Sequence, residues 1–291
     1  MTGNLISHVS DTAFWIAQLR ANETARPDAL FSDPLAATLA GTQGAEIAAG
    51  MPLAAMTAWS VVMRTCIIDG FIRDAIANGV DAVLNLGAGL DTRPYRLELP
   101  PGLRWIEADF DHVLDYKEAQ LQGQQPRCRL ERVRIDLTDR SARTAFFAEL
   151  DAQAGRILVL TEGVIPYLSL EEAAALAQDL RVIRRLSGWL VDYDSPEVLR
   201  YRQRAMQHKM QKAPFRFCPQ DWFGFFAELG WCAKEVRYYT EVAEASGRPP
   251  PLPWYLRLLL KIGERVAPEQ SRKQKQFAGY ALMLPDSQAE S

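Results

Sequence analysis

Apolar residues recur at helical spacing through the first 80 residues of the chain, and their period changes after that point. Positions 61, 68, 72 and 76 are apolar and fall on one face of a helix. We therefore expect residues 10–80 to be helical, with one face packed inward. A helix is also predicted to begin at Asp33 and Pro34, since proline favours the first helical position after an aspartate cap.

From residue 81 onward, short apolar runs alternate with helical patterns. Such runs are typical of strands that are buried on both faces, and we expect strands at 82–86, 103–107, 132–135, 157–160 and 189–193. The segments between them have helical periodicity, at 113–121, 142–150 and 170–186. This alternation predicts a mainly parallel sheet covered by helices on both faces, with ligands at the carboxyl ends of its strands.

The last third of the chain departs from that alternation. A helix is predicted over 221–229 and ends at Gly230, and two later strands, at 233–239 and 277–284, are expected to form a hairpin at the sheet edge. We expect loops at 248–253 and 268–276. The predicted organisation is a helical lid at residues 1–80 and a core at residues 81–291, with a helical insertion at about 196–230.

The first predicted strand ends in a glycine turn with the sequence LGAGLDTR at residues 86–93. Gly87 and Gly89 lack a Cβ atom, so the backbone there can turn sharply and approach a ligand. The dinucleotide pattern would require a third glycine at position 92, which is Thr92, and Asp91 would place a carboxylate beside a pyrophosphate. The turn therefore favours a nucleoside that carries an ammonium or sulfonium group over a nicotinamide dinucleotide.

Acidic residues close the following predicted strands. Glu107 and Asp109 end the second strand, Asp136 follows the third and Glu162 follows the fourth. Asp109 lies twenty positions after Gly89, where a carboxylate can accept hydrogen bonds from both ribose hydroxyls. Each carboxylate taken alone is equally explained as a helix cap or a surface charge. Their coincidence at one sheet edge favours a ligand site.

Composition narrows the class of protein further. The 291 residues carry a formal charge of −3, which lacks the basic excess that drives nucleic-acid binding. Four scattered cysteines and three isolated histidines indicate neither a disulfide framework nor a metal site. The start of the chain has no secretory signal pattern, and the apolar run at 256–262 is too short for a membrane span. We expect a cytoplasmic enzyme without nucleic-acid or membrane partners.

The glycine turn, the acidic strand ends and several motifs near the start of the chain occur together in one known family. In these motifs the chain resembles the leucine carboxyl methyltransferase superfamily, particularly its bacterial branch of polyketide O-methyltransferases, typified by tetracenomycin carboxyl methylation. The resemblance implies a Rossmann-like class I methyltransferase fold with S-adenosylmethionine as cofactor. It rests on residues 20–21, 26–28, 33–36, 64–69, 85–96, 107–109, 117, 136–137, 162–164 and 230–231.

The same resemblance implies roles for individual residues. Arg64 would bind the methionine carboxylate of the cofactor, for which a guanidinium fork is well suited, and Glu162 would lie near the methionine amino group. Without the resemblance, Arg64 would be interpreted as forming a helix-surface ion pair with Asp69 or Glu46. Asp109 would hold the ribose. The predicted cofactor residues are Arg64, Gly87, Ala88, Gly89, Asp91, Asp109, Asp136, Leu137 and Glu162, with Asp136 and Leu137 framing the adenine.

The chain departs from the family pattern in two places. Residues 109–112 lack the proline that the family often has after the acidic pair, which affects the start of the next helix. Tyr167 matches a family tyrosine on the acceptor side, but Pro166 stands before it and can redirect the backbone. We therefore name Tyr167 as a candidate acceptor-side residue and assign no catalytic base.

The sequence favours an O-methyltransferase that acts on a small-molecule carboxylate or hydroxyl in polyketide or other specialised metabolism. A carboxylate, with a pKa near 4, is ionised at neutral pH and needs no general base, whereas a phenol, with a pKa near 10, is helped by one. No histidine stands in an obvious base position, which favours carboxyl methylation. Two alternatives stay open: methylation of a protein or peptide C-terminal carboxylate, and a regulatory protein that binds the cofactor without transferring methyl.

Two further stretches have two interpretations each. The basic residues between 200 and 216 either attract an acidic acceptor to a helical lid or form a solvated helix face, and the solvated face is favoured. The aromatic residues between 222 and 231 either line the acceptor pocket or belong to the core, and the core is favoured. The basic set comprises Arg200, Arg202, Arg204, His208, Lys209, Lys212 and Arg216.

Overall fold

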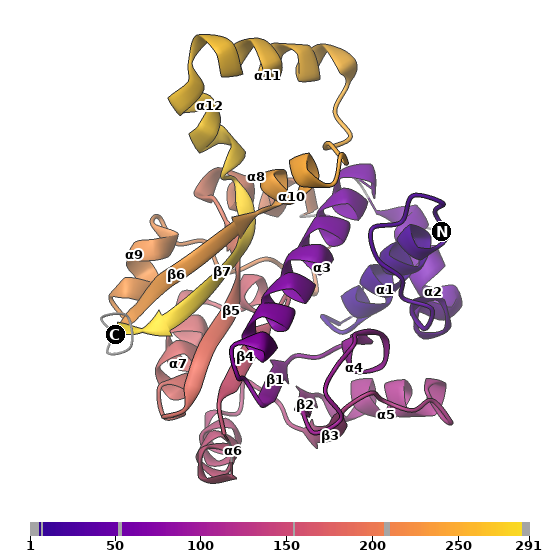
Figure 1. Cartoon of the computed structure of the whole chain (residues 1–291), viewed down its shortest axis with the longest axis vertical. Coiled ribbons are helices and arrows are strands. Elements are labelled where there is room, and N and C mark those ends of the chain that lie inside the picture. Colours follow the sequence, from indigo (N-terminus) through magenta and orange to yellow (C-terminus); the bar gives the residue numbers. More distant parts are fainter. Residues whose placement is uncertain (1–5, 7, 52–53, 154, 207–209, 287–291) are drawn as a thin grey trace.

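A computed structural model describes residues 6, 8–51, 54–153, 155–206 and 210–286. A seven-stranded sheet runs through it in the order β3-β2-β1-β4-β5-β7-β6 (Figure 1). The first five strands are parallel, and β7 is antiparallel to both of its neighbours. The strands are β1 (Ala82–Leu86), β2 (Arg104–Asp109), β3 (Arg129–Arg134), β4 (Ile157–Thr161), β5 (Leu186–Asp194), β6 (Trp231–Tyr238) and β7 (Ala278–Pro285).

Helices cover both faces of the sheet, and the predicted mainly parallel α/β fold with an antiparallel edge is confirmed. Every residue of β1 and β4 is buried, which explains why these strands are continuous apolar runs. The helices before β5 are α1 (Asp11–Thr24), α2 (Ala36–Gly50), α3 (Ala54–Ala77), α4 (Arg93–Arg96), α5 (Asp111–Gln120), α6 (Arg140–Gln153), the 3₁₀ turn η1 (Ile165–Tyr167) and α7 (Leu170–Leu180). After β5 come α8 (Pro196–Met206), α9 (Trp222–Ala227), α10 (Tyr239–Ala245), α11 (Trp254–Val266) and α12 (Pro268–Lys275).

Two layers of side chains form the core. On one face of the sheet, α6, α7 and α9 contribute residues such as Phe147, Leu176 and Phe226. On the other face, α3 packs its buried apolar residues against the strands. By length and composition α3 could cross a membrane, but slightly more than half of the window concerned is buried inside the protein. It is therefore a core helix of the fold.

The helices α1 and α2 pack on each other (Figure 1) and on the turn that follows β1. Ala17, Leu39 and Ala40 form a small apolar cluster with Leu90 of that turn and with Leu121, which follows α5. The N-terminal helices thus lie beside the carboxyl ends of β1 and β2. The division into a lid at 1–80, a core at 81–291 and an insertion at about 196–230 stays a prediction, although α3 packs directly on the sheet.

The predicted helix start at Asp33 and Pro34 is wrong. The helix begins at Ala36 with Leu35 as its cap residue. Asp33 is only 1% exposed, and its Oδ2 accepts a hydrogen bond from Arg20 Nε at 2.8 Å. A carboxylate held by a buried arginine is not available to cap a helix, and local sequence does not reveal a partner thirteen residues away.

Two expectations for the C-terminal third also need correction. β6 and β7 do pair antiparallel, but α10, α11 and α12 connect them, so they are not a hairpin, and β7 lies between β5 and β6. The predicted loop at 268–276 contains α12. A proline at the first helical position, followed by glutamate, glutamine, arginine and lysine, suits a helix better than its polarity suggested.

Glu107 belongs to a buried ion pair at the back of β2. Its Oε1 lies 2.7 Å from Lys117 Nζ, both side chains are fully buried, and its Oε2 accepts from Arg132 Nε at 3.0 Å. The interpretation of Glu107 as part of the acidic edge at the site is wrong, since its charge is balanced inside the protein. Removing one partner of a buried ion pair is strongly destabilising, because the other charge then stays buried without compensation.

We expect Lys117→Met to lower the free energy of unfolding by about 3 kcal/mol, because it leaves the Glu107 carboxylate buried beside Arg132 alone. Arg134→Met is the control, because Arg134 and its partner Asp115 are both exposed and an exposed pair contributes under about 1 kcal/mol. Urea unfolding of both variants measures the difference. Equal losses would show that the burial of the Glu107 pair has no energetic consequence.

Candidate functional site

A large cavity opens at the carboxyl ends of the parallel strands. It has a volume of about 1130 Å³ and is lined by segments of α1, α3, α8 and α10 and by the loops after β1 to β4. All ten residues named from the sequence line it: Arg64, Gly87, Ala88, Gly89, Asp91, Asp109, Asp136, Leu137, Glu162 and Tyr167. Residues that are up to 103 positions apart in the sequence therefore share one site.

The glycine turn after β1 forms one wall of the cavity. Gly87 and Gly89 have φ values of 65° and 49°, in the left-handed region that glycine adopts most readily. A Cβ atom on Gly87 would lie 2.5 Å from Cγ2 of Val164, which follows β4. The absence of a side chain at Gly87 therefore allows the two loops to approach each other closely.

Asp109 ties this turn to the end of β2. Its Oδ2 accepts a hydrogen bond from Gly89 N at 2.6 Å, and its Oδ1 accepts from Phe110 N at 2.7 Å. The side chain is buried, and this burial raises the pKa of the carboxyl although both backbone N–H groups favour its charged form. A carboxylate offers about four lone-pair directions. Two backbone bonds leave Asp109 able to accept hydrogen bonds from a ligand in the cavity.

The cavity continues past the end of β3. Asp136 is exposed, and its Oδ1 accepts from the backbone N and the Oγ1 of Thr138 at 2.8 and 2.7 Å. Ile135, Leu137 and Phe110 provide apolar surface around it. This part of the cavity is therefore a partly apolar slot with a carboxylate at its edge, which suits a planar base with an amino group.

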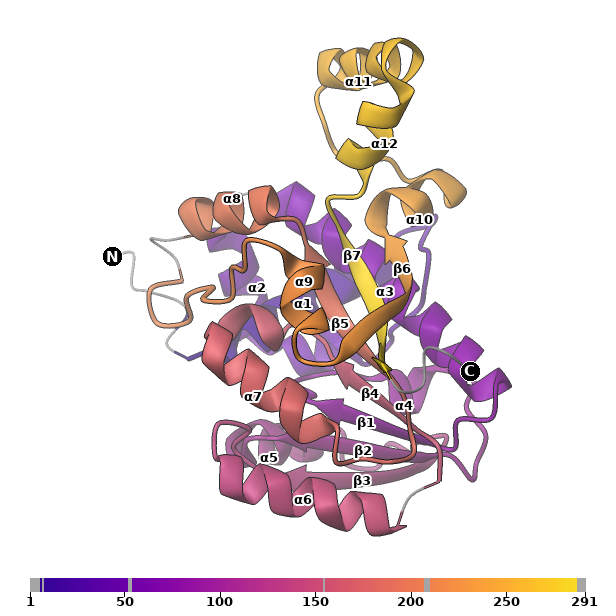
Figure 2. The same cartoon turned by 90° about the vertical axis from the view of Figure 1, so that its left-hand side faces the viewer.

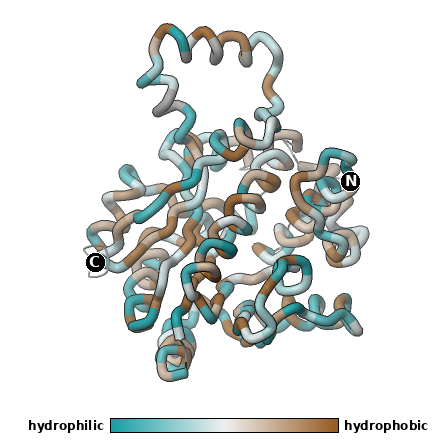
Figure 3. Tube along the Cα trace, viewed as in Figure 1, coloured by the Kyte–Doolittle hydropathy of each residue, from teal (hydrophilic) through white to brown (hydrophobic). Residues whose placement is uncertain are grey.

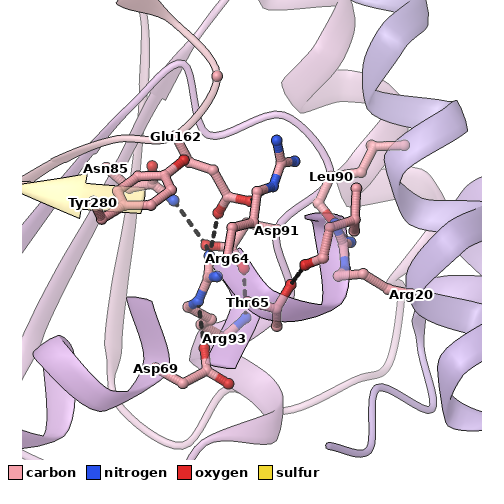
Figure 4. Close-up of polar contacts among 12 residues, drawn as sticks. Arg20, Arg64, Thr65, Asp69, Asn85, Leu90, Asp91, Arg93, Glu162 and Tyr280 are labelled. Carbon is pink, nitrogen blue, oxygen red and sulfur yellow. Dashed lines mark hydrogen bonds and ion pairs between the residues drawn. The ribbon is translucent and has the colours of Figure 1, made fainter. Parts of the chain in front are cut away.

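An ion-pair network closes the other side of the turn (Figure 4). Arg64 Nε, on α3, lies 2.9 Å from Glu162 Oε1, and Arg93 Nη1 donates to Glu162 Oε2 at 2.6 Å. Arg93 also donates to Asp91 Oδ2 at 3.0 Å and to Asp69 Oδ1 at 2.7 Å. The alternative that Arg64 forms a surface pair with Asp69 or Glu46 is wrong, because Arg64 faces the cavity beside Glu162 and Asp69 binds Arg93 and Arg96.

The network sets the charge state of its carboxylates. Burial disfavours the charged form of Glu162, but Arg93 and Arg64 outweigh it and hold the pKa of that carboxyl below its usual value. At Asp91, burial is also unfavourable, but Arg93 together with Lys117, Arg20 and Arg96 outweighs it and keeps the pKa well below its ordinary range. The sequence alone suggests an open negative charge at Asp91, whereas the structure shows it balanced by Arg93. Attraction of a cationic ligand therefore depends on the whole network.

Sequence reasoning missed several functional positions. Arg93 is 2% exposed and organises the network, yet the sequence shows it only as part of the glycine-turn motif. Asp192 on β5 also lines the cavity, accepts from Gly163 N at 3.1 Å and accepts from Tyr280 Oη at 2.5 Å. Burial raises its pKa. The only sequence signal for Asp192 is that a charged residue stands in the otherwise apolar strand β5. Hydrophobic periodicity alone does not show that such a residue belongs to a site.

The part of the cavity that is lined by η1, α8 and the segment after α8 contains aromatic and basic residues. The Tyr167 ring lies 5.2 Å from that of Phe215, and burial raises the pKa of its phenol. Arg202 lines the cavity and lies 2.5 Å from Asp194 Oδ2, whose pKa burial raises to about 6 despite that partner. This part of the cavity therefore combines apolar surface with a cation whose partner is a buried carboxylate.

The structure places some residues of the basic stretch at the cavity and others at the surface, and it places most of the aromatic stretch in the core. Arg202, Lys212 and Arg216 line the cavity, whereas Arg200 pairs with Glu197 at the surface. His208 and Lys209 lie outside the described residues. The aromatic stretch is largely core, since Trp222, Phe226 and Trp231 are buried in the cluster between the sheet, α7 and α9.

Comparisons with known proteins agree with this geometry. Residues 13–181 match the leucine carboxyl methyltransferase family. A protein of Frankia alni, named "Putative S-adenosyl-L-methionine-dependent methyltransferase", is 32% identical over 262 residues and covers 83% of this chain and 90% of its own. A protein of Streptomyces coelicolor with the same descriptive name is 37% identical over 258 residues and covers 84% and 89%.

Solved structures show the same fold at low identity. A crystal structure named as that of a "putative methyltransferase" from Thermobifida fusca has a TM-score of 0.57 and 14% identity, and covers 97% of this chain and 96% of its own. A DUF574 family protein from Streptomyces avermitilis has a TM-score of 0.52 and 16% identity, and covers 92% and 96%. The family match spans more than half of the chain, and the Frankia relative matches over nearly its whole length. The chain belongs to the leucine carboxyl methyltransferase family.

Proposed function

We propose that the protein transfers the methyl group of S-adenosylmethionine to an oxygen of a small acidic molecule, in polyketide or related specialised metabolism. The family makes it a methyltransferase that depends on S-adenosylmethionine. The observation that carries the finer proposal is one cavity whose lining includes both the polar residues at the strand ends and apolar and basic residues of η1, α8 and the segment after α8. Its volume of about 1130 Å³ exceeds that of most single-ligand pockets and leaves room for both reactants.

The polar residues of the lining fit the cofactor group by group. Arg64 Nε is buried and makes no hydrogen bond despite its 2.9 Å approach to Glu162, so a donor is available for a carboxylate. Glu162, kept ionised by two arginines, suits an ammonium group. Asp109 has acceptor capacity for ribose hydroxyls. Asp136 and Leu137 flank the slot for adenine.

S-adenosylmethionine supplies an electrophilic methyl group for an in-line displacement by an electron-rich oxygen. The protein's contribution is to position the reactants and to keep water out. The Arg64–Glu162 pair fixes one end of the cofactor site, Asp109 fixes the middle, and Gly87 lets the backbone lie close to the ligand. The acceptor side is formed by Tyr167, Phe215 and neighbouring apolar residues, which shield the reacting oxygen.

The residues on the acceptor side support a carboxylate as the acceptor. A carboxylate is already ionised at neutral pH and needs no proton removed. Among the described residues that line the cavity there is no histidine, and burial raises the pKa of Tyr167, so its phenol stays protonated and acts as a donor. Arg202, Lys212 and Arg216 attract an anionic acceptor to this side of the cavity.

We expect Arg64→Ala to weaken the binding of S-adenosylmethionine by about 2 to 4 kcal/mol, because the methionine carboxylate loses a charge-assisted partner. Arg73→Ala is the matched control, since Arg73 is an exposed arginine on the same helix. Titration calorimetry of both folded variants provides the comparison. If Arg64→Ala binds as tightly as Arg73→Ala, Arg64 has no part in the cofactor site.

Gly87→Ala should lower the affinity for S-adenosylmethionine at least tenfold, about 1.4 kcal/mol, because the new methyl group displaces Val164 and moves the turn. Gly123→Ala is a control with the same kind of backbone strain, since Gly123 has φ of 83° and a Cβ atom added to it would meet no neighbour within 4 Å. Urea unfolding measures the loss of stability from backbone strain in each variant, and titration calorimetry measures the loss of affinity for S-adenosylmethionine. Equal affinity in the two variants would contradict a close backbone approach at Gly87.

Incubation with S-adenosylmethionine and a panel of aromatic and aliphatic acids should give a product heavier by one CH2 group. Mild alkali should remove that group, because a methyl ester hydrolyses and a methyl ether does not. Phenols of matched size without a carboxyl group serve as controls, and mass spectrometry is the measurement. A product that resists alkali would contradict carboxyl methylation, and no product from any acceptor would favour a protein that only binds the cofactor.

A further inference from the structure

Helix α11 projects from the body of the protein. It forms an arch with α12 beyond the end of the sheet where α10 lies, and both views show it standing clear of the other helices (Figures 1 and 2). Its main packing partner is α12. The helix therefore has little of its surface covered by the rest of the chain.

Many residues of α11 are hydrophobic, as the brown positions along its trace show (Figure 3), and a group of these side chains is exposed. Among the described residues, eleven large hydrophobic side chains are exposed, and seven of them lie in this one helix. Trp254 is 75% exposed and Val266 is 78% exposed. Exposed apolar residues scattered singly need no explanation, but a concentration of this kind marks an interaction surface. The seven residues are Trp254, Tyr255, Leu256, Leu258, Leu259, Ile262 and Val266.

The sequence of α11 gives this surface a charged border. Arg257, Lys261 and Arg265 are spaced four residues apart and so fall on one side of the helix, while leucine, isoleucine and valine occupy the wider remaining side. Residues 254–275 contain six basic and two acidic residues, a formal charge of +4 in a chain whose formal charge is −3. A broad apolar side, a basic side and aromatic residues at one end are typical of helices that lie in the surface of a membrane.

Charge distinguishes a membrane from a second copy of the chain as the covering partner. Pairing of two copies through α11 would bring two segments of charge +4 together, and like charges across an interface oppose binding. An anionic lipid surface instead attracts each basic residue. On such a surface the basic side of the helix contacts the lipid headgroups, and its apolar side contacts the acyl chains.

The arch formed by α11 and α12 also adjoins the cavity. Pro250 and Leu252, which lead into α11, and Ser271 and Lys275 of α12 all line it. A surface that contacted a membrane at α11 would therefore place this side of the cavity near the bilayer.

We propose that α11 docks the protein on membranes that contain anionic lipids, contrary to the expectation from the sequence of no membrane partner. The docking itself is independent of the reaction. If the proposed function holds, the acceptor is an amphiphilic acid that reaches the cavity from the bilayer surface.

The test uses the full-length protein and vesicles of phosphatidylcholine with or without phosphatidylserine. We expect sedimentation with the anionic vesicles, weak sedimentation with neutral ones, and release by salt, which screens the basic residues. Leu258→Gln, Leu259→Gln and Ile262→Gln combined should reduce the bound fraction at least tenfold. Val182→Gln is the control, since Val182 is 49% exposed on the body of the protein. Brominated lipid should quench the tryptophan fluorescence of the wild-type protein, and the Trp254→Phe substitution should reduce this quenching, because Trp254 is the tryptophan of α11.

Failure of wild-type protein to sediment with anionic vesicles would overturn the proposal, as would equal binding by the triple variant. A dimer in analytical ultracentrifugation that the triple substitution abolishes would show that a second copy covers α11, and would also overturn it. The three substituted residues are outside the cavity lining. Methylation of a water-soluble acceptor should therefore be unchanged in the triple variant, which keeps a failure of docking distinct from a failure of the proposed function.

Discussion

The buried guanidinium of Arg93 joins the parts of the molecule on which the site depends. It is 2% exposed and binds three carboxylates, from Asp69 of the long core helix, Asp91 of the glycine turn and Glu162 after β4. A charge taken out of water is tolerated only when partners surround it. The fold therefore has a strong energetic reason to hold these three elements in one arrangement.

The proposed cofactor site in the cavity follows from that arrangement. Glu162 uses one oxygen for Arg93 and presents the other to Arg64, so the pair at the end of the cavity is positioned by a residue that is itself buried. On the opposite side, Asp109 fixes the glycine turn through Gly89 N. Because methyl transfer depends on placing the reactants along one axis, a site held from both sides in advance of binding suits the reaction.

Much of the fold was predictable because its signals are local. Short apolar runs predicted the five parallel strands, and the glycine turn with the resemblance to the family predicted ten residues that all line one cavity. Two of the failures involve contacts between distant residues. Nothing near Asp33 indicates that it binds Arg20 instead of capping a helix. The pattern also did not separate Glu107, whose charge is buried with Lys117, from Asp109, which is two residues further along the same strand and reaches the cavity.

A crystal structure with S-adenosylhomocysteine bound tests the central claim most directly. We expect the ribose hydroxyls within hydrogen-bond distance of Asp109, the amino-acid carboxylate on Arg64, and unchanged contacts from Arg93 to Asp69, Asp91 and Glu162. A ligand bound outside the cavity, or an Arg93 side chain that leaves its three carboxylates on binding, would contradict that claim.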